Sequence, residues 1–333
     1  MTLKQLKYLI GIVDSGLNIT AAAERLYTSQ PGISKQLKQL EAELGVQLFT
    51  RKGKSLAAIT PAGREVIARA RKILREVENI ASLASDLTAE QEGKLSIATT
   101  HTQARYVLPE TIRSFREHYP KVDLELHQGT SEQIAELIGT NKVDFAIASG
   151  GRHLFSNLTM LPIFHWHRIA LVPKQHPLAE QRKKLDLATL AEYPLVTYVF
   201  SLTGESSFKR AFHEQGLEPR VVFTARDADI IKTYVRMGMG VGVIASMAFE
   251  PKDAEDLVAL DARGLFPKLT TWIGFPREMV LRGYMVDFIH LLAPQYSKDL
   301  IRRAAAAQTQ EEVDDMLKNI VLPERGISEE TVQ

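Results

Sequence analysis

The chain has 333 residues, of which 45% are hydrophobic and 24% charged, and its formal net charge at pH 7 is +1. It is too long for one ordinary core, its composition is that of a globular protein, and no apolar run approaches the ~18 residues that cross a membrane. The absence of cysteine excludes disulfides, thiolate metal sites and cysteine nucleophiles. A polar N-terminus without a secretory signal predicts a cytoplasmic protein.

Charge is distributed unevenly along the chain. In the first sixty residues eight lysines or arginines stand against four acidic residues, whereas from Ser297 onward five basic residues meet eight acidic ones. A basic surplus on a small N-terminal unit is typical of nucleic-acid binding, although a solvated surface would give the same count. The acidic C-terminal segment is not expected to touch a polyanion.

The N-terminal residues predict three helices in close succession. Apolar residues at helical spacing indicate a first helix that stops at Ser15–Gly16, and a second short helix begins at about Thr20, a plausible N-cap. A third begins with Ser29 as N-cap and carries Pro31 in its first turn, where the missing N–H costs nothing. Two short helices joined by a tight turn form the helix-turn-helix that reads a major groove.

The third helix has two different faces. Ile33 and Leu37 belong to an apolar arc that faces the core, and Ser34 and Lys35 belong to a polar, basic arc. The following stretch, VQLFTRKGKSLAAITPAG, predicts two strands around a basic wing that can sit on phosphate. The candidate DNA-binding residues are Ser29, Gln30, Pro31, Ser34, Lys35, Lys38, Arg51 and Lys54. We expect Gln30, Ser34 and Lys35 to face base edges and the basic wing to face the backbone.

These motifs carry a resemblance to a known family. The stretch AAAERLYTSQPGISKQLKQLEAELGVQLFTRKGKSLAAITPAG resembles the winged helix-turn-helix of the LysR-type transcriptional regulators almost position by position. Further along, IATTHTQARY, HQGTSEQIA, DFAIAS and DADIIKTYVRMGMGVGVIASMA resemble the branch of that family that regulates the cysteine genes. The resemblance covers nearly the whole chain and fades after about Pro294.

A long helix is predicted over residues 60–90. A stripe of apolar residues runs along it, namely Val66, Ala70, Ile73 or Leu74, Val77, Ile80 and Leu83. A helix of this length has no evident core of its own, which favours pairing with a second copy, and an amphipathic spacer within a monomer is the alternative. The resemblance implies a linker and dimerisation helix.

Strands and helices alternate after Lys94. KLSIATT, VDLELHQG and DFAIAS, with helices between them, predict a βαβαβ lobe with a parallel sheet, and RIALVP, PLVTYV, VVFTA and GVGVIA predict a second lobe. The predicted domains are a winged helix-turn-helix over 1–59, the linker helix over 60–90, an effector domain over 91–296 and an acidic, partly helical tail over 297–333. Lobe I spans about 91–163 and 268–293, and lobe II spans about 164–267. The resemblance implies that this two-lobed α/β domain is like a periplasmic binding protein.

A ligand of such a domain is expected beyond the carboxyl ends of the strands, where helix N-termini favour anions. The candidate effector-binding residues are Thr100, Thr102, Gln103, Ser149, Trp166, Thr203 and Arg226. The alternative is that the Thr and Ser residues only cap helices. Ser149 stands where the branch resembled has Thr, and Arg226 replaces a small polar residue, so both bear on ligand choice.

Motifs for enzymatic or metal chemistry are weak. GMGVG lacks the third glycine of a dinucleotide fingerprint and follows a helix, and HWH at 165–167 has no nearby carboxylate or cysteine. No catalytic spacing of Ser, His and Asp is recognised. We therefore predict no catalytic residue, no cofactor and no metal.

The sequence predicts a DNA-binding transcription regulator that senses a small metabolite. The resemblance implies control of cysteine biosynthesis and sulfur assimilation, with N-acetylserine, an O-acetylserine-like compound, sulfate or thiosulfate as effector. The expected partners are promoter DNA, RNA polymerase and further copies of the chain, as a dimer of dimers, with no membrane partner. A regulator of the same family that answers another metabolite, and an enzyme or binding protein with a basic tether, are the alternatives.

Overall fold

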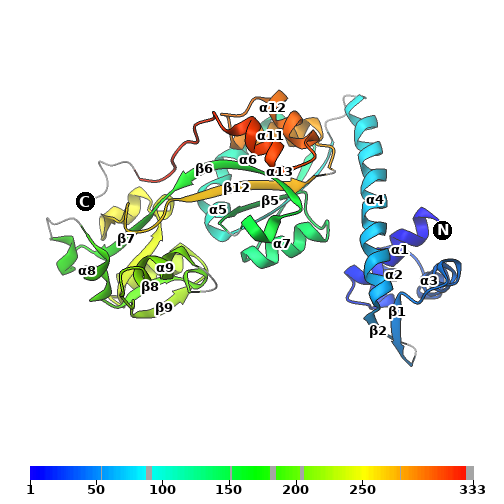
Figure 1. Ribbon diagram of the computed structural model, residues 1–333, viewed down its shortest axis with the longest axis horizontal. Coiled ribbons are helices and arrows are strands. Elements are labelled where there is room, and N and C mark those ends of the chain that lie inside the picture. Colours follow the sequence, from blue (N-terminus) through cyan, green and yellow to red (C-terminus); the bar gives the residue numbers. More distant parts are fainter. Residues whose placement is uncertain are drawn as a thin grey trace. The chain divides into compact units, whose positions relative to one another are not determined.

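The computed structural model describes residues 1–53, 55–87, 92–150, 152–180, 185–202, 206–277 and 279–327. The chain divides into two compact units, Met1–Glu90 and Gln91–Gln333. The first is helical with one small hairpin, and the second is built on two β-sheets (Figure 1). No described helix is long and apolar enough to cross a bilayer.

The first unit contains α1 (Leu3–Asp14), α2 (Ile19–Arg25), α3 (Gln30–Leu44), β1 (Phe49–Lys52), β2 (Ser55–Ile59) and α4 (Pro61–Leu87). The predicted start of α3 is confirmed, because Ser29 Oγ accepts a hydrogen bond from Gly32 N at 3.3 Å and Pro31 lies in the first turn. The predicted cap of α2 is wrong. Asn18, not Thr20, caps that helix, because its Oδ1 accepts hydrogen bonds from two backbone N–H groups at 3.0 and 3.1 Å.

The core of this unit is formed by the apolar faces of α1 and α3 and includes Leu6, Ile12, Ile33 and Leu37. A buried carboxylate connects this core to the hairpin. Glu41 accepts hydrogen bonds from Leu48 N at 2.9 Å and from Arg51 Nη2 at 2.8 Å, so its charge is paired. The predicted wing is therefore tied to α3 by a partly buried ion pair as well as by chain connectivity.

Helix α4 is used in two different ways along its length. Ile67 and Ala70 are buried in the core of the first unit, so the expectation that this helix has no core of its own is wrong for its N-terminal half. Two apolar side chains of the predicted stripe remain uncovered, Ile73 at 38% and Ile80 at 66% exposure. The side chain of Leu83 lies outside the described residues. The uncovered face is thus centred on Ile73 and Ile80.

Lobe I of the second unit is a three-layer α/β structure. Its sheet has the strand order β4-β3-β5-β12-β6, with β3 (Gly93–Thr99), β4 (Val122–Gln128), β5 (Phe145–Ser149), β6 (Leu158–Trp166) and β12 (Leu269–Pro276). β3 is parallel to β4 and β5 as predicted, whereas β12 returns antiparallel to β5 and β6. Helices α6 (Leu108–His118) and α11 (Gly283–Leu292) cover one face, and α7 (Ser131–Gly139) covers the other (Figure 1).

Lobe II repeats this design around a second sheet. Its strand order is β11-β7-β10-β8-β9, with β7 (Arg168–Pro173), β8 (Leu195–Tyr198), β9 (Val221–Ala225), β10 (Val241–Ala245) and β11 (Leu257–Asp261). α8 (Leu187–Ala191) and α9 (Ser207–His213) pack on one face, and α10 (Ala228–Arg236) packs on the other. The inward-facing side chains are mostly Val, Ile, Leu and Phe, as expected for a sheet covered on both faces.

The C-terminal segment, which the sequence analysis treats as an acidic tail, belongs to lobe I. Its helices α12 (Lys298–Ala306) and α13 (Gln310–Leu317) place Ile301, Val313 and Leu317 in the lobe I core. Beyond them, the chain lies along the outer strand β6, where His165 N donates to Pro323 O at 2.9 Å and Arg325 N donates to His165 O at 2.8 Å. Five acidic residues of this segment thus lie on helices whose apolar sides are buried, namely Asp299, Glu311, Glu312, Asp314 and Asp315.

We expect a second copy of the chain to cover the uncovered face of α4. Replacing Ile73 and Ile80 together by Glu would bury charge at that seam and should dissociate the oligomer, as measured by light scattering. Ala68→Glu, at an exposed position on another side of the same helix, is the control and should leave the size unchanged. An unaltered size for the double variant would refute pairing through this face.

Candidate functional site

The first candidate site is the outer face of α3 with the wing. Gln30, Lys35 and Lys38 are exposed, whereas Ile33 and Leu37 on the same helix are buried, so the two predicted faces of the helix are present. Ser29 and Pro31 are also exposed, and Ser34 is half-buried. These side chains share the first three turns of α3, which is the part of a recognition helix that meets base edges.

Arg51 of the wing, which we expected to contact phosphate, is paired within the protein. One guanidinium nitrogen of Arg51 is bonded to the buried Glu41, so this side chain helps to hold the hairpin as well as lying near the surface. Lys54 lies outside the described residues. Tyr27, which the sequence analysis did not single out, is 99% exposed, lies two residues before the N-cap of α3 and has φ +50°. It is an additional candidate contact beside the basic face.

The second candidate site is a cavity of about 540 Å³ in the second unit. Residues from both lobes line it, and they include Thr100, Thr102, Gln103, Ser149, Leu154, Trp166, Arg168, Tyr198, Phe200, Ser206, Ala245 and Leu269. Five of the seven predicted effector-binding residues are in that set. Thr203 lies outside the described residues, and Arg226 is exposed and is not among the lining residues.

Strand topology explains why the lobe I residues converge. β3 and β5 are parallel neighbours, so their carboxyl ends, at Thr99 and Ser149, lie at the same edge of the sheet. Helix α5 (His101–Tyr106) begins directly after β3 and brings Thr102 and Gln103 to that edge. Thr100 occupies the N-cap position of α5, yet its side chain makes no capping hydrogen bond. Helix capping therefore does not account for the hydroxyl of Thr100.

A hydrogen-bond network forms the polar wall of the cavity. Gln103 Nε2 donates to Ser149 Oγ at 3.2 Å and to Thr271 Oγ1 at 3.3 Å, and these two hydroxyls are 2.7 Å apart. Trp166 Nε1 also donates to Ser149 Oγ at 3.1 Å. The side-chain oxygen of Gln103 is buried without a partner. Thr271 comes from β12, far away in sequence, and only the pairing of β12 with β5 could have revealed it.

Arg168 is the main residue that the sequence analysis missed. Its side chain lines the cavity, is 3% exposed, and has no hydrogen-bond partner at Nε or Nη1. Its guanidinium lies 5.5 Å from the ring centroid of Phe266. Burial lowers the pKa of Arg168 to about 10, so the group is still charged near neutral pH. The signal in the sequence was a single arginine at the start of the apolar run IALVP.

The cost of this arrangement is substantial. Taking an unpaired ion out of water costs several kcal/mol, of which a cation–π contact offsets about 0.5 to 2 kcal/mol. Nearby Tyr198 is fully buried, and burial raises its pKa, so it supplies no negative charge. Its hydroxyl instead accepts a hydrogen bond from Ala245 N at 3.1 Å. The cavity therefore combines hydroxyls and an amide from lobe I with a cation from lobe II, and Glu132 of lobe I adds a carboxylate to its lining.

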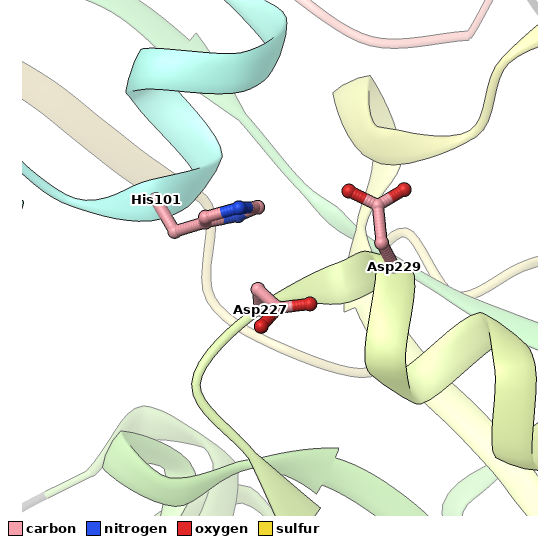
Figure 2. A group of neighbouring side chains, drawn as sticks. All are labelled: His101, Asp227 and Asp229. Atoms are coloured by element: carbon pink, nitrogen blue, oxygen red, sulfur yellow. The ribbon is translucent and has the colours of Figure 1, made fainter.

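Contacts between the lobes flank the cavity. Tyr106 of α5 donates to Asp229 of α10 at 2.8 Å, and Arg105 pairs with Glu250 at 3.2 Å. Beside them, His101, Asp227 and Asp229 place ligand-type atoms within 4.8 Å of one another where α5 meets the start of α10 (Figure 2). Both carboxylates already accept hydrogen bonds within the protein. Asp229 accepts one from the Tyr106 hydroxyl, and Asp227 accepts one from Ile230 N at 2.8 Å. This cluster belongs to the lobe-to-lobe contact.

A buried ion pair supports that contact from within lobe II. Lys232 is 1% exposed and donates to Asp253 at 2.8 Å and to Ala248 O at 3.0 Å. Burial by itself raises the pKa of Asp253, but hydrogen bonds, chiefly from Lys232, outweigh it and hold the pKa below its usual value. The pair keeps α10 fixed against the short 3₁₀ helix Pro251–Glu255, and thereby fixes Asp229 opposite Tyr106.

Comparison with known proteins decides the family. Residues 3–64 match the family described as bacterial regulatory helix-turn-helix protein, lysR family, and residues 88–297 match the LysR substrate binding domain. The chain is 44% identical over 322 residues to the HTH-type transcriptional regulator CysB of Haemophilus influenzae, which covers 97% of this chain and 99% of that protein. The chain belongs to the LysR family of transcriptional regulators.

Two further relatives place it within the LysR family. It is 40% identical over 314 residues to the HTH-type transcriptional regulator cbl of Escherichia coli, which covers 94% of this chain and 99% of that protein. The crystal structure of the cofactor-binding domain of the Cbl transcriptional regulator superposes with a TM-score of 0.61 at 41% identity, over 66% of this chain and 96% of that one. The relatives are regulators, not enzymes, and the chain is a LysR-type regulator related to CysB and Cbl.

Proposed function

We propose that this LysR-type regulator binds a small anionic metabolite in the cavity between its two lobes and controls genes of cysteine biosynthesis and sulfur assimilation. The observation that carries the proposal is that the polar residues Thr102, Gln103 and Ser149 of lobe I and the buried cation Arg168 of lobe II line one cavity. The effector is an acetylserine-like compound or a sulfate-type anion. Similarity to CysB and Cbl supports the pathway, and a LysR regulator of another pathway with a different effector is the alternative.

The DNA-bound form is proposed to be a dimer of dimers. Two operator half-sites require two DNA-binding heads, and the uncovered face of α4 offers a surface through which a second copy can pair. Gln30, Ser34 and Lys35 read bases, while Ser29, Lys38 and the wing residues Arg51 and Lys54 bind phosphate. RNA polymerase is the proposed partner at the promoter.

The proposed link between ligand and DNA is the relative arrangement of the lobes. A ligand shifts an equilibrium only by its difference in affinity for the two states. Thr102 and Gln103 come from lobe I and Arg168 and Tyr198 from lobe II, so a ligand that bridges them favours one lobe arrangement over another. Arg226, which is not among the lining residues, and Thr203, which lies outside the described residues, remain candidates from the sequence alone.

The assigned reading face can be tested at Gln30. An amide that pairs with a base edge contributes about 1 to 3 kcal/mol of discrimination, so Gln30→Ala should relax sequence preference at a footprinted promoter site. Gln39→Ala, on the opposite side of α3, is the matched control and should change neither affinity nor preference. The measurement is competitive binding of promoter fragments with single base substitutions. Unchanged affinity and preference in Gln30→Ala would place the reading face elsewhere.

The assigned effector site can be tested at Thr102 and Gln103. Each loses at least one ligand hydrogen bond when replaced by Ala, which should weaken binding of an acetylserine by about 0.5 to 1.5 kcal/mol. Calorimetry on the full chain measures this, with Gln308→Ala, an exposed amide on the C-terminal segment, as control. Wild-type affinity in both cavity variants would put the effector at another site, and loss of all DNA binding would indicate misfolding.

A further inference from the structure

Arg168 carries a buried positive charge that the protein's own contacts do not neutralise. Nε and Nη1 have no hydrogen-bond partner, and no carboxylate among the described residues pairs with the guanidinium. Lys232, which is buried to a similar degree in the same unit, is paired with Asp253 at 2.8 Å. Natural proteins keep an unpaired buried charge where it has a function, because replacing it by an apolar side chain would otherwise stabilise the fold.

The known neighbours of the Arg168 guanidinium do not neutralise its charge. Phe266 lies 5.5 Å away and contributes a ring face, which offers no hydrogen-bond acceptor. Trp166 and Arg168 are two residues apart on one extended segment, so both project to the same side and both line the cavity. Arg168 therefore lies in the wall of the cavity with two guanidinium nitrogens, Nε and Nη1, that are buried and have no partner.

We propose that Arg168 binds the carboxylate or sulfonate group of an organic effector, and that the effector-free protein carries a buried charge which only the effector neutralises. The role of Arg168 rests on the proposed function, since it requires that the cavity between the lobes be the effector site. A guanidinium binds a carboxylate or sulfonate through two parallel N–H···O bonds, which fixes orientation as well as charge.

The rest of the cavity selects an organic molecule over a bare inorganic anion. Its volume of about 540 Å³ falls among pockets for organic ligands, which span about 300 to 1,000 Å³. Leu154, Trp166 and Phe200 supply apolar wall for a carbon skeleton. The buried oxygen of Gln103 lacks a donor, which a hydroxyl or amide N–H can supply and the sulfate dianion cannot. The effector class is an organic acid that carries its own hydrogen-bond donor.

The test compares heat stability without ligand and ligand affinity in the same variants of the full chain. Arg168→Met removes the unbalanced charge, so its melting temperature without effector should rise by about 3 to 8 °C. The same variant should bind N-acetylserine or O-acetylserine, whichever wild type binds better, about 30-fold or more weakly. Arg168→Lys keeps the charge without the two-pronged geometry and should lose about tenfold. Sulfate should bind wild type at least about tenfold more weakly than the better acetylserine.

Arg236→Met is the matched control for stability. Arg236 is paired with Asp253 and Asp256, each at 2.7 Å, so its removal should lower the melting temperature. A similar fall in Arg168→Met would show that Arg168 is structural and would overturn the inference. Wild-type affinity in Arg168→Met would overturn it as well.

Failure of this role and failure of the proposed function can be told apart. Weak acetylserine binding by Thr102→Ala and Gln103→Ala together with normal binding by Arg168→Met would overturn the role of Arg168 alone. Normal binding by all three variants would remove the effector from the cavity and would overturn both. If wild type binds neither acetylserine nor sulfate, the proposed effectors are wrong. The melting temperature of Arg168→Met then decides whether Arg168 carries an unbalanced charge. A higher melting temperature than that of wild type would support this, and a lower one would overturn it.

Discussion

The chain passes from one sheet of the second unit to the other at His167, with no loop between β6 and β7, and this tight crossing determines what the cavity contains. Side chains alternate along an extended segment, so Trp166 and Arg168 face one side and His165 and His167 the other. The first pair lines the cavity. The second pair faces away from it, with His165 Nδ1 2.9 Å from Thr270 Oγ1 and His167 3.8 Å from Glu324. His165 thus has a side-chain contact within lobe I, whereas both ring nitrogens of the buried His167 lack a hydrogen-bond partner.

Buried charge separates structural from functional positions in this protein. Glu41 in the first unit is held by Arg51 and a backbone N–H, and Lys232 and Asp253 in lobe II are held by each other. Each of these pairs fixes one element against another, as expected where a buried charge is compensated. Arg168 is buried to a similar degree without such a partner. Burying Arg168 without a partner costs folding free energy. We propose that a ligand supplies the negative charge that pairs with it, and the proposed function therefore centres on the cavity.

Local signals in the sequence were enough for the DNA-binding unit. Ser29 and Pro31 mark the start of α3, and the spacing of Ile33 and Leu37 separates its buried face from its exposed one. The start of α2 was misplaced because Asn18 and Thr20 are both good caps and only the backbone geometry decides between them. For α4, the apolar stripe was visible, but its division between an internal core and an uncovered face depends on packing against α1.

The cavity was predicted in part, for a physical reason. Thr100, Thr102, Gln103 and Ser149 follow strand ends in the sequence, so topology alone brings them to one edge. Thr271 and Tyr198 come from strands whose position depends on pairing between distant segments, and nothing local announces them. The acidic composition of the C-terminal segment led to the prediction of a tail. Ile301 and Val313 instead pack in the lobe I core and anchor the segment there.

The central claim is that the cavity and the DNA-binding face are coupled, and thermodynamic reciprocity gives its most direct test. The affinity of the full chain for the acetylserine that it binds better would be measured by calorimetry without DNA and with a saturating promoter fragment from the chain's own footprint. If the effector changes DNA binding, DNA must change effector affinity by the same factor, for which we expect about fivefold or more. Equal affinities with and without DNA would show that the two sites are independent and would contradict the account.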